Sequence, residues 1–279
     1  MTGIGLSKKI VVFGGTGFLG KRICENAISR GYDVVSITGT GKKPNPYEGE
    51  ESSWINKVNW KRGNIFYPET YTNELKNAKA VVHSIGILLE NDSYKKIVGS
   101  NDGIINTVSD LFKTSNPMAK TPDITGNNVI IDKTYERFNT QSALVSAEAL
   151  IQANHEKPAF VYISADRGFP GIPSGYIESK RRTEYELYQM QPEIRPVFLR
   201  PGFMYDPSEE NHNSIRKHIK NSMDILEGFN KKLLFNSLDG IIRPTISTKL
   251  VAKWCIDKIE DDEFRGPLML DAMINLKNC

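Results

Sequence analysis

The chain has 279 residues, of which 39% are hydrophobic and 25% charged, and its net charge is +3 at pH 7. This composition is typical of a globular protein and excludes a disordered or fibrous chain. Its lysines and arginines are spread along the sequence instead of forming one basic stripe, so we expect no nucleic-acid partner. The three cysteines are odd in number and far apart, which favours neither a disulfide framework nor a zinc site.

The N-terminal segment predicts a strand, a glycine-rich turn and a helix. Residues 10–13 are an apolar run typical of a buried strand, and residues 21–30 carry apolar side chains at helical spacing, with Gly31 as the stop. Between them lies Gly14-Gly15-Thr16-Gly17-Phe18-Leu19-Gly20. Glycines permit positive φ and let a pyrophosphate approach the backbone, while free N–H groups at the start of the helix favour its negative charge. We predict a dinucleotide at this turn; the alternative is a tight turn without a ligand.

The end of the second predicted strand, residues 34–37, bears on the choice of dinucleotide. An NAD site usually has an acidic residue here to hold the ribose hydroxyls, and this chain has Thr38 in that position. Asp33 lies at the opposite end of the strand, whereas Thr38 to Lys43 offer hydroxyl, backbone and cationic contacts to a 2′-phosphate. We therefore predict NADP(H), with NAD(H) as the weaker candidate, and name Thr38 and Lys42 as contacts. The alternative for Lys42 is a solvated loop.

Further strands are predicted at residues 80–84, 160–164 and 197–200, with helical patterns between them. These strands are continuous apolar runs, which indicates a parallel sheet buried on both faces. The expected fold is therefore α/β, a doubly wound parallel-sheet Rossmann fold.

The pattern is interrupted twice along the chain. Residues 91–133 are polar and weakly periodic, and we expect an inserted loop there. After residue 202 the alternation fades, so we assign residues 1–202 to an NADP-binding Rossmann domain and residues 203–279 to a small C-terminal substrate-side extension that is not an independent domain. That extension contains a final helix near residues 249–259 and a basic amphipathic stretch at 211–235.

No apolar run reaches the roughly 18 residues that cross a bilayer, so any membrane contact is expected to be peripheral. The stretch at 211–235 is a candidate for touching anionic lipid or admitting a polyprenyl substrate. The alternative is a helix that packs on the core and exposes its other face to solvent.

The segment Tyr176-Ile177-Glu178-Ser179-Lys180 carries a candidate catalytic pair. If it is helical, the phenol and the ammonium share one face, and the ammonium lowers a phenol pKa that starts at about 10. Tyr176 then becomes a general acid or base near neutral pH. Ser164 ends a predicted strand, where its hydroxyl can polarise a substrate carbonyl. We predict Ser164, Tyr176 and Lys180 as the catalytic group, with a chance helical pair as the alternative.

His83 also ends a predicted strand. It has no histidine, cysteine or carboxylate partner at metal-ligand spacing, so we interpret it as a structural histidine and predict no metal site.

Taken in order, the glycine turn, Val81-Val82-His83-Ser84, Ser164, Tyr176-x-x-x-Lys180 and Arg200-Pro201-Gly202 resemble the extended and atypical short-chain dehydrogenases/reductases. The resemblance covers roughly residues 8–259. Segments such as Val12-Phe-Gly-Gly, Ser164-Ala-Asp and Leu199-Arg-Pro-Gly-Phe-Met are similar to fungal mitochondrial members associated with coenzyme Q (ubiquinone) biosynthesis. That subgroup is related to the nucleotide-binding accessory subunit of respiratory complex I.

This resemblance implies a mitochondrial protein on the matrix face of the inner membrane. It implies that proteins of the ubiquinone-biosynthesis complex and a small-molecule or prenylated quinone precursor are its partners. It places catalysis on Ser164, Tyr176 and Lys180. It places an adenine contact on Asn64, where many relatives have Asp, and further cofactor contacts on Gly14, Gly17, Phe18, Leu19, Gly20, Ser84, Ile85 and Gly86.

Three functions follow as hypotheses. In the first, the chain is an NADP(H)-dependent oxidoreductase in which Tyr176 exchanges a proton with a quinone precursor. In the second, it is a nucleotide-binding structural subunit of the ubiquinone-biosynthesis complex that turns nothing over, since fold alone does not establish activity. The third is nucleotide-sugar epimerase or dehydratase chemistry.

Overall fold

The computed structural model describes residues 8–45, 52–87, 134–154, 156–167, 173–209 and 243–275. The predicted insertion at 91–133 and the basic stretch at 211–235 lie outside these residues.

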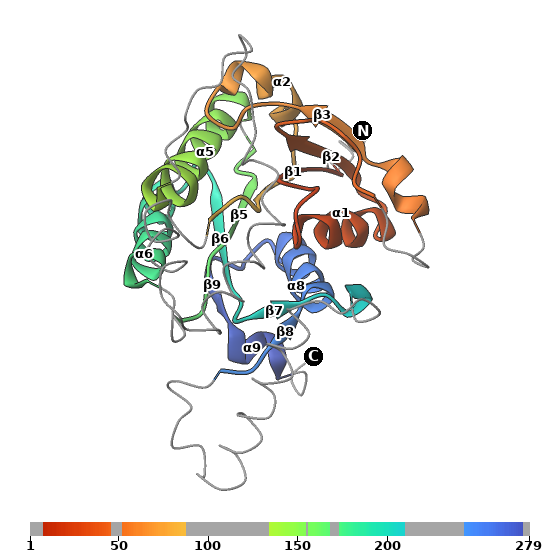
Figure 1. Ribbon diagram of the computed structural model, residues 1–279. Helices are drawn as coiled ribbons and strands as arrows, with labels where there is room; N and C mark the ends of the chain where they lie inside the picture. The colour runs from red at the N-terminus through yellow and green to blue at the C-terminus, as the bar shows by residue number, and fades with distance from the viewer. Residues whose placement is uncertain are drawn as a thin grey trace, which may run out of the picture.

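A seven-stranded parallel sheet organises the fold, with strand order β3-β2-β1-β4-β5-β6-β9 (Figure 1). The order reverses between β1 and β4, because the chain builds outward on one side of β1 and then returns to build on the other. In such sheets ligands bind at the carboxyl ends of the strands, beside this reversal. The strands are β1 (Lys9–Phe13), β2 (Asp33–Thr38), β3 (Asn59–Arg62), β4 (Ala80–His83), β5 (Ala159–Ile163), β6 (Arg195–Arg200) and β9 (Gly266–Met269).

Helices cover both faces of the sheet. On β1, Ile10 and Val12 pack with α1 (Gly20–Ser29) and α8 (Thr248–Glu260), whereas Val11 and Phe13 pack with α5 (Ser142–Ala153) and α6 (Ser174–Gln189). Figure 1 shows the two helix layers on opposite sides. The side chains of residues 10–13 are fully buried, which explains why this part of β1 is a continuous apolar run. The predicted doubly wound α/β fold is confirmed.

Shorter elements connect these layers. A π-helical turn, η4 (Glu136–Gln141), leads into α5, and β7 (Met204–Tyr205) pairs with β8 (Ile246–Ser247) in a separate two-stranded sheet. The remaining helices and turns are α2 (Thr72–Leu75), α9 (Leu270–Ile274), η1 (Ser53–Lys57), η2 (Pro68–Thr70) and η5 (Pro207–Glu209). In the described ranges, no helix is long and apolar enough to span a membrane.

The five predicted strands and the helices at 21–30 and 249–259 are confirmed, with shifts of one or two residues at their ends. Strands β4 and β5 each end one residue earlier than expected, so Ser84 and Ser164 are the first residues beyond their strands. Strands β3 and β9 were not predicted. Both have only four residues and lie at the edges of the sheet. The β3 sequence Asn-Trp-Lys-Arg is largely exposed and β9 is exposed at every second residue, so neither has the continuous apolar run of a central strand.

A buried ion pair joins α1 to the segment that follows β7. The Arg22 guanidinium donates to both carboxylate oxygens of Asp206, at 2.7 and 2.8 Å, and both side chains are almost completely buried. Burial raises the pKa of Asp206, but the hydrogen bonds from Arg22 and from the Ser208 backbone, together with the charge of Arg22, outweigh burial and hold this pKa below its ordinary value. The C-terminal region is thereby fastened to the helix that follows the glycine turn.

We expect Asp206→Asn to lower the free energy of unfolding by about 3 kcal/mol at pH 7, because the buried Arg22 guanidinium then keeps only the partly exposed Glu25, at 2.8 Å, as a counter-charge. Since the folded pKa of Asp206 lies below the unfolded one, the stabilisation is complete above about pH 4 and is lost as the pH falls further. The wild-type advantage in urea unfolding should therefore shrink in acid. Asp262→Asn, whose side chain is 74% exposed, is the control; equal losses in the two variants would contradict the account.

Candidate functional site

The glycine turn is built so that side chains are excluded from its inner face. Gly14 adopts φ +82°, and its carbonyl accepts a hydrogen bond from the Gly17 N–H at 2.9 Å. A Cβ on Gly20 would lie 2.1 Å from the Gly14 carbonyl oxygen, so the first residue of α1 has room only for hydrogen. Leu19 is buried in the core below the turn, and Phe18 is half-buried. The turn is thus a compact backbone cradle at the helix N-terminus, where a pyrophosphate fits.

The segment after β4 lies directly against this turn. The Ser84 N–H donates to the Phe13 carbonyl at 3.0 Å, and a Cβ on Gly14 would lie 3.2 Å from both the Ser84 carbonyl oxygen and Ile85 Cγ1. On its other side, a Cβ on Gly86 would lie 3.1 Å from Lys180 Nζ. Residues 84–86 therefore lie between the predicted phosphate turn and the predicted catalytic lysine.

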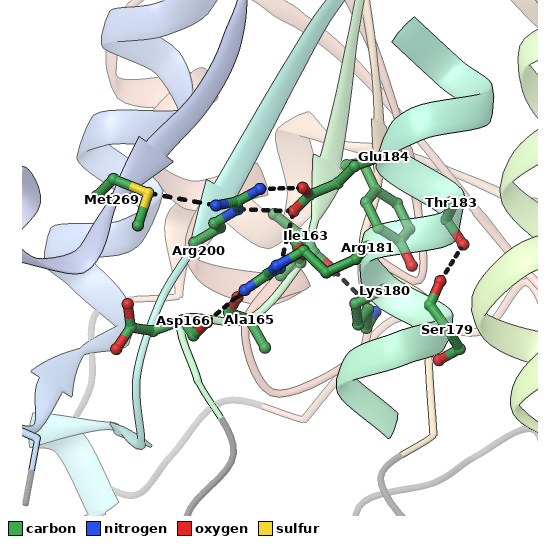
Figure 2. A network of polar contacts seen from close by, with 12 residues as sticks. Ile163, Ala165, Asp166, Ser179, Lys180, Arg181, Thr183, Glu184, Arg200 and Met269 are labelled. Atoms are coloured by element: carbon green, nitrogen blue, oxygen red, sulfur yellow. Dashed lines mark hydrogen bonds and ion pairs between the residues drawn. The ribbon is translucent and has the colours of Figure 1, made fainter. Parts of the chain in front are cut away.

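Lys180 is buried on the inner side of α6. Its ammonium donates to the Ile163 carbonyl at 2.9 Å (Figure 2). The ammonium also lies 4.6 Å from the centre of the Tyr162 ring. Burial is the main cause that lowers its pKa, to about 7, and the nearby Arg181 guanidinium adds to the effect. Lys180 therefore titrates near neutral pH, which suits a group that exchanges protons.

Tyr176 lies one turn before Lys180 on α6, as the spacing predicts, with the ammonium 5.9 Å from the centre of its ring. Its pKa is raised to about 12, chiefly by burial and also by Tyr135, while Arg181 opposes the rise. The sequence analysis expected a lowered pKa, and this direction was wrong. The reason is that the Lys180 ammonium is directed to the Ile163 carbonyl, so desolvation of the phenol prevails.

Ser164 follows β5 immediately and is 3% exposed. Its hydroxyl oxygen accepts a hydrogen bond from Arg181 Nη1 at 3.1 Å. Because Lys180 binds the carbonyl of the preceding residue, Ser164 and Lys180 are held at the same strand end. The three predicted catalytic residues therefore come from the end of β5 and the first two turns of α6.

Two polar residues of this region were missed by the sequence analysis. Asn139 lies in the π-helical turn η4, where its side chain bonds both backbone groups of Ile87 and donates to Ser179 Oγ at 3.1 Å. A π-turn breaks the 3.6-residue period, so no periodicity signals it, although such turns are frequent at functional sites. Arg181 is the second, and only the tertiary fold shows what it contacts.

The predicted adenosine-side residues follow β2 and β3, which are neighbours at the carboxyl edge. Thr38 accepts a hydrogen bond from the Gly41 N–H at 3.0 Å, and the Lys42 side chain is exposed. Lys43 instead donates to Asn56 at 3.0 Å. Asn64 uses its side-chain oxygen to accept from the Phe66 N–H at 3.1 Å, which leaves its amide N–H₂ for other contacts.

His83 is fully buried, and its Nε2 lies 2.9 Å from Ser142 Oγ. That hydroxyl donates to the Phe138 carbonyl, so it accepts from His83, whose proton is therefore on Nε2. Burial is the main cause that lowers the His83 pKa, to about 3, so the ring is neutral. In the part of the chain that the structure describes, no group of three or more His, Cys, Asp or Glu residues could hold a metal ion.

Comparison with known proteins agrees with this geometry. The profile of the NAD dependent epimerase/dehydratase family matches residues 10–117. The chain belongs to the short-chain dehydrogenase/reductase superfamily, in this epimerase/dehydratase group, and the resemblance stated from its motifs is confirmed. The family implies a nicotinamide dinucleotide cofactor.

Among its relatives, the chain is 41% identical to "MIOREX complex component 2" of Saccharomyces cerevisiae, over 95% of this chain and 98% of that protein. It is 28% identical to an uncharacterized chloroplastic protein of Arabidopsis thaliana, over 96% of this chain and 76% of that protein.

Solved structures share the fold. A short-chain dehydrogenase/reductase from Serratia marcescens superposes with a TM-score of 0.54 at 12% identity, covering 95% of this chain and 96% of the other. UDP-N-acetylglucosamine 4-epimerase from Bacillus cereus superposes with a TM-score of 0.51 at 17% identity, covering 94% and 76%.

Gly14→Ala should weaken NADPH binding at least about tenfold, because a methyl group would press on the Ser84 carbonyl and Ile85, where the cofactor is expected. Gly31→Ala is the matched control, since Gly31 has a similar φ of +77° and nothing within 4 Å of its Cβ position. Both variants should lose stability, but only the first should lose affinity in a nicotinamide-fluorescence titration. Equal affinities in the two variants would place the dinucleotide elsewhere.

Proposed function

We propose that the chain is an NADP(H)-dependent oxidoreductase that acts on a quinone precursor in mitochondrial ubiquinone biosynthesis. One observation carries the enzymatic part: residues 84–86 touch the glycine turn on one side and approach Lys180 on the other. A nicotinamide extending from the turn along this segment would reach Tyr176 and Ser164. When bound, the cofactor would supply the hydride, and the protein would supply orientation and the proton.

The residues favour the reducing direction. With a pKa of about 12, Tyr176 is protonated at neutral pH and is ready to donate its proton to a substrate oxygen as the hydride arrives. Ser164 would hold that oxygen by a hydrogen bond, and Lys180, with a pKa of about 7, would return a proton to Tyr176 after turnover. Asn139 would keep the segment containing Ile87 in register with α6.

The preference for NADP(H) is supported by the end of β2. Residues 38–43 contain no carboxylate that would repel a 2′-phosphate, and the Lys42 side chain is exposed there. Arg62, at the end of β3, lies beside Gly41 and adds a second cation to this edge.

Work in a complex is supported by the yeast relative, which is named as a component of one. The mitochondrial location, the matrix face of the inner membrane and the ubiquinone pathway come from the resemblance to the fungal coenzyme Q proteins. The proposed partners are accordingly the other proteins of that pathway.

Two other functions have specific support. A non-catalytic nucleotide-binding subunit is favoured by the engagement of the Lys180 ammonium with a backbone carbonyl. A nucleotide-sugar epimerase is favoured by the family that matches residues 10–117. Binding of UDP-sugars with an affinity above that for any quinone would support the epimerase.

Lys42→Ala should raise the Kd for NADPH about tenfold, equivalent to about 1.4 kcal/mol, and leave the Kd for NADH unchanged, because only NADPH carries the 2′-phosphate. Lys43→Ala, which removes a lysine already bonded to Asn56, serves as the control and should change neither value. Wild-type protein that binds NADH as tightly as NADPH would contradict the proposed preference.

Tyr176→Phe should abolish function without unfolding the chain, because it removes only the phenolic oxygen. In cells whose endogenous protein is replaced by this variant, we expect the ubiquinone content to fall to that of cells that lack the protein. Tyr188→Phe, on the exposed side of the same helix, should keep wild-type levels. Normal ubiquinone with Tyr176→Phe would instead identify a structural subunit.

A further inference from the structure

Helix α6 carries a second, partly buried cation beside the predicted catalytic lysine. Arg181 follows Lys180, so its side chain leaves the helix about 100° further round and reaches the segment that follows β5. Its guanidinium donates to Ser164 Oγ at 3.1 Å. It also donates to the Ala165 carbonyl at 2.8 Å and to the Asp166 carbonyl (Figure 2). One side chain thus holds three consecutive residues.

The segment needs these donors because it is buried outside the sheet ladder. Ser164, Ala165 and Asp166 are each less than 9% exposed, and buried carbonyl groups without a donor are costly. The planar fork of an arginine reaches two carbonyls and a hydroxyl from two separate nitrogens, whereas a lysine has all three of its donors on a single nitrogen.

The Arg181 guanidinium is itself held in place by a carboxylate. Glu184, one turn further along α6, accepts from Arg181 Nη1 at 3.0 Å and from Arg200 Nε at 2.9 Å, and its second oxygen accepts from Arg200 Nη2. Its side chain is only 6% exposed. Arg200 ends β6, so this network fixes the Arg181 fork against two strand ends.

This arrangement determines what the Ser164 hydroxyl can do. Arg181 donates into its oxygen, so that lone pair is occupied, and in the described residues no acceptor binds the hydroxyl's own proton. The hydroxyl is therefore left as a donor, with a positive charge behind it. A donor polarised in this way makes a stronger hydrogen bond to an oxygen on which negative charge develops.

We propose that Arg181 is a positioning residue of this site: it orients Ser164 as a hydrogen-bond donor to the substrate oxygen and strengthens that bond with its charge. The inference rests on the proposed function, because it requires Ser164 to contact the substrate.

The electrostatics of Tyr176 point the same way. Burial and Tyr135 raise the pKa of this phenol, and Arg181 is the cation that opposes the rise. Arg181 therefore favours the transfer of a proton from Tyr176, in addition to its contact with Ser164.

A double-mutant cycle tests the inference, with NADPH-dependent reduction of 9,10-phenanthrenequinone as the assay. Arg181→Met and Ser164→Ala should each lower kcat about 10²-fold. The double variant should lose clearly less than the product of the two single losses, because Arg181 acts mainly through Ser164. Arg181→Lys, which keeps the charge but loses the fork, should fall between wild type and Arg181→Met. The Kd for NADPH should not change in any of them.

Arg182→Met is the matched control, because Arg182 is the next residue on the helix, 62% exposed and paired only with Glu136 among the described residues; it should keep wild-type kcat. Circular dichroism checks folding, and if Arg181→Met does not fold, Arg181→Lys completes the cycle with Ser164→Ala. Unchanged kcat in the Arg181 variants, or losses that multiply in the double variant, would overturn the inference alone. Absence of turnover by the wild-type chain would overturn the proposed function and this inference together.

Discussion

The site depends on one close approach of backbone to backbone, where the glycine turn meets the segment that follows β4. Parallel pairing of β1 with β4 brings Phe13 beside His83, and the next residues of both strands then have to pass each other. They do so with the Ser84 carbonyl oxygen 3.2 Å from the Cβ position of Gly14, a contact that any larger residue would disturb. The strand order reverses at this point, and in open α/β sheets such a reversal is where dinucleotides bind.

Helix α6 places three polar groups around the next strand end, on two of its faces. Tyr176 and Lys180 share one face, one turn apart, while Arg181 turns toward β6. The two cations donate to different carbonyls at the end of β5. Lys180 donates to the Ile163 carbonyl, and Arg181 donates to the carbonyls of the two residues after Ser164. The first residue beyond β5 is thus fixed by both cations, although only one of them belongs to the motif that the sequence displays.

Much of this arrangement is visible in the sequence because its causes are local. Continuous apolar runs predict buried parallel strands, and the glycine spacing predicts the turn. Only the steric demand at Gly20 is local, since it comes from Gly14 and Gly15, whereas the demand at Gly14 comes from Ser84 and Ile85. What could not be predicted depends on such tertiary contacts. Strand β9 is short and joins the sheet only because β6 is there to pair with it, and Asn139 interrupts the helical period in a π-turn. The pKa of Tyr176 was expected to fall because its partner was known from spacing, whereas burial and the orientation of Lys180 are properties of the folded chain.

The central claim is that the glycine turn, residues 84–86 and the Tyr176–Lys180 pair form one cofactor site. A crystal structure of the chain with NADP⁺ tests it most directly. The account predicts the pyrophosphate on the backbone of the turn, the 2′-phosphate beside Lys42, and the nicotinamide along residues 84–86 with its reactive carbon facing Tyr176. A nucleotide bound with its nicotinamide directed away from Tyr176 would contradict the account, and so would a dinucleotide bound outside the turn.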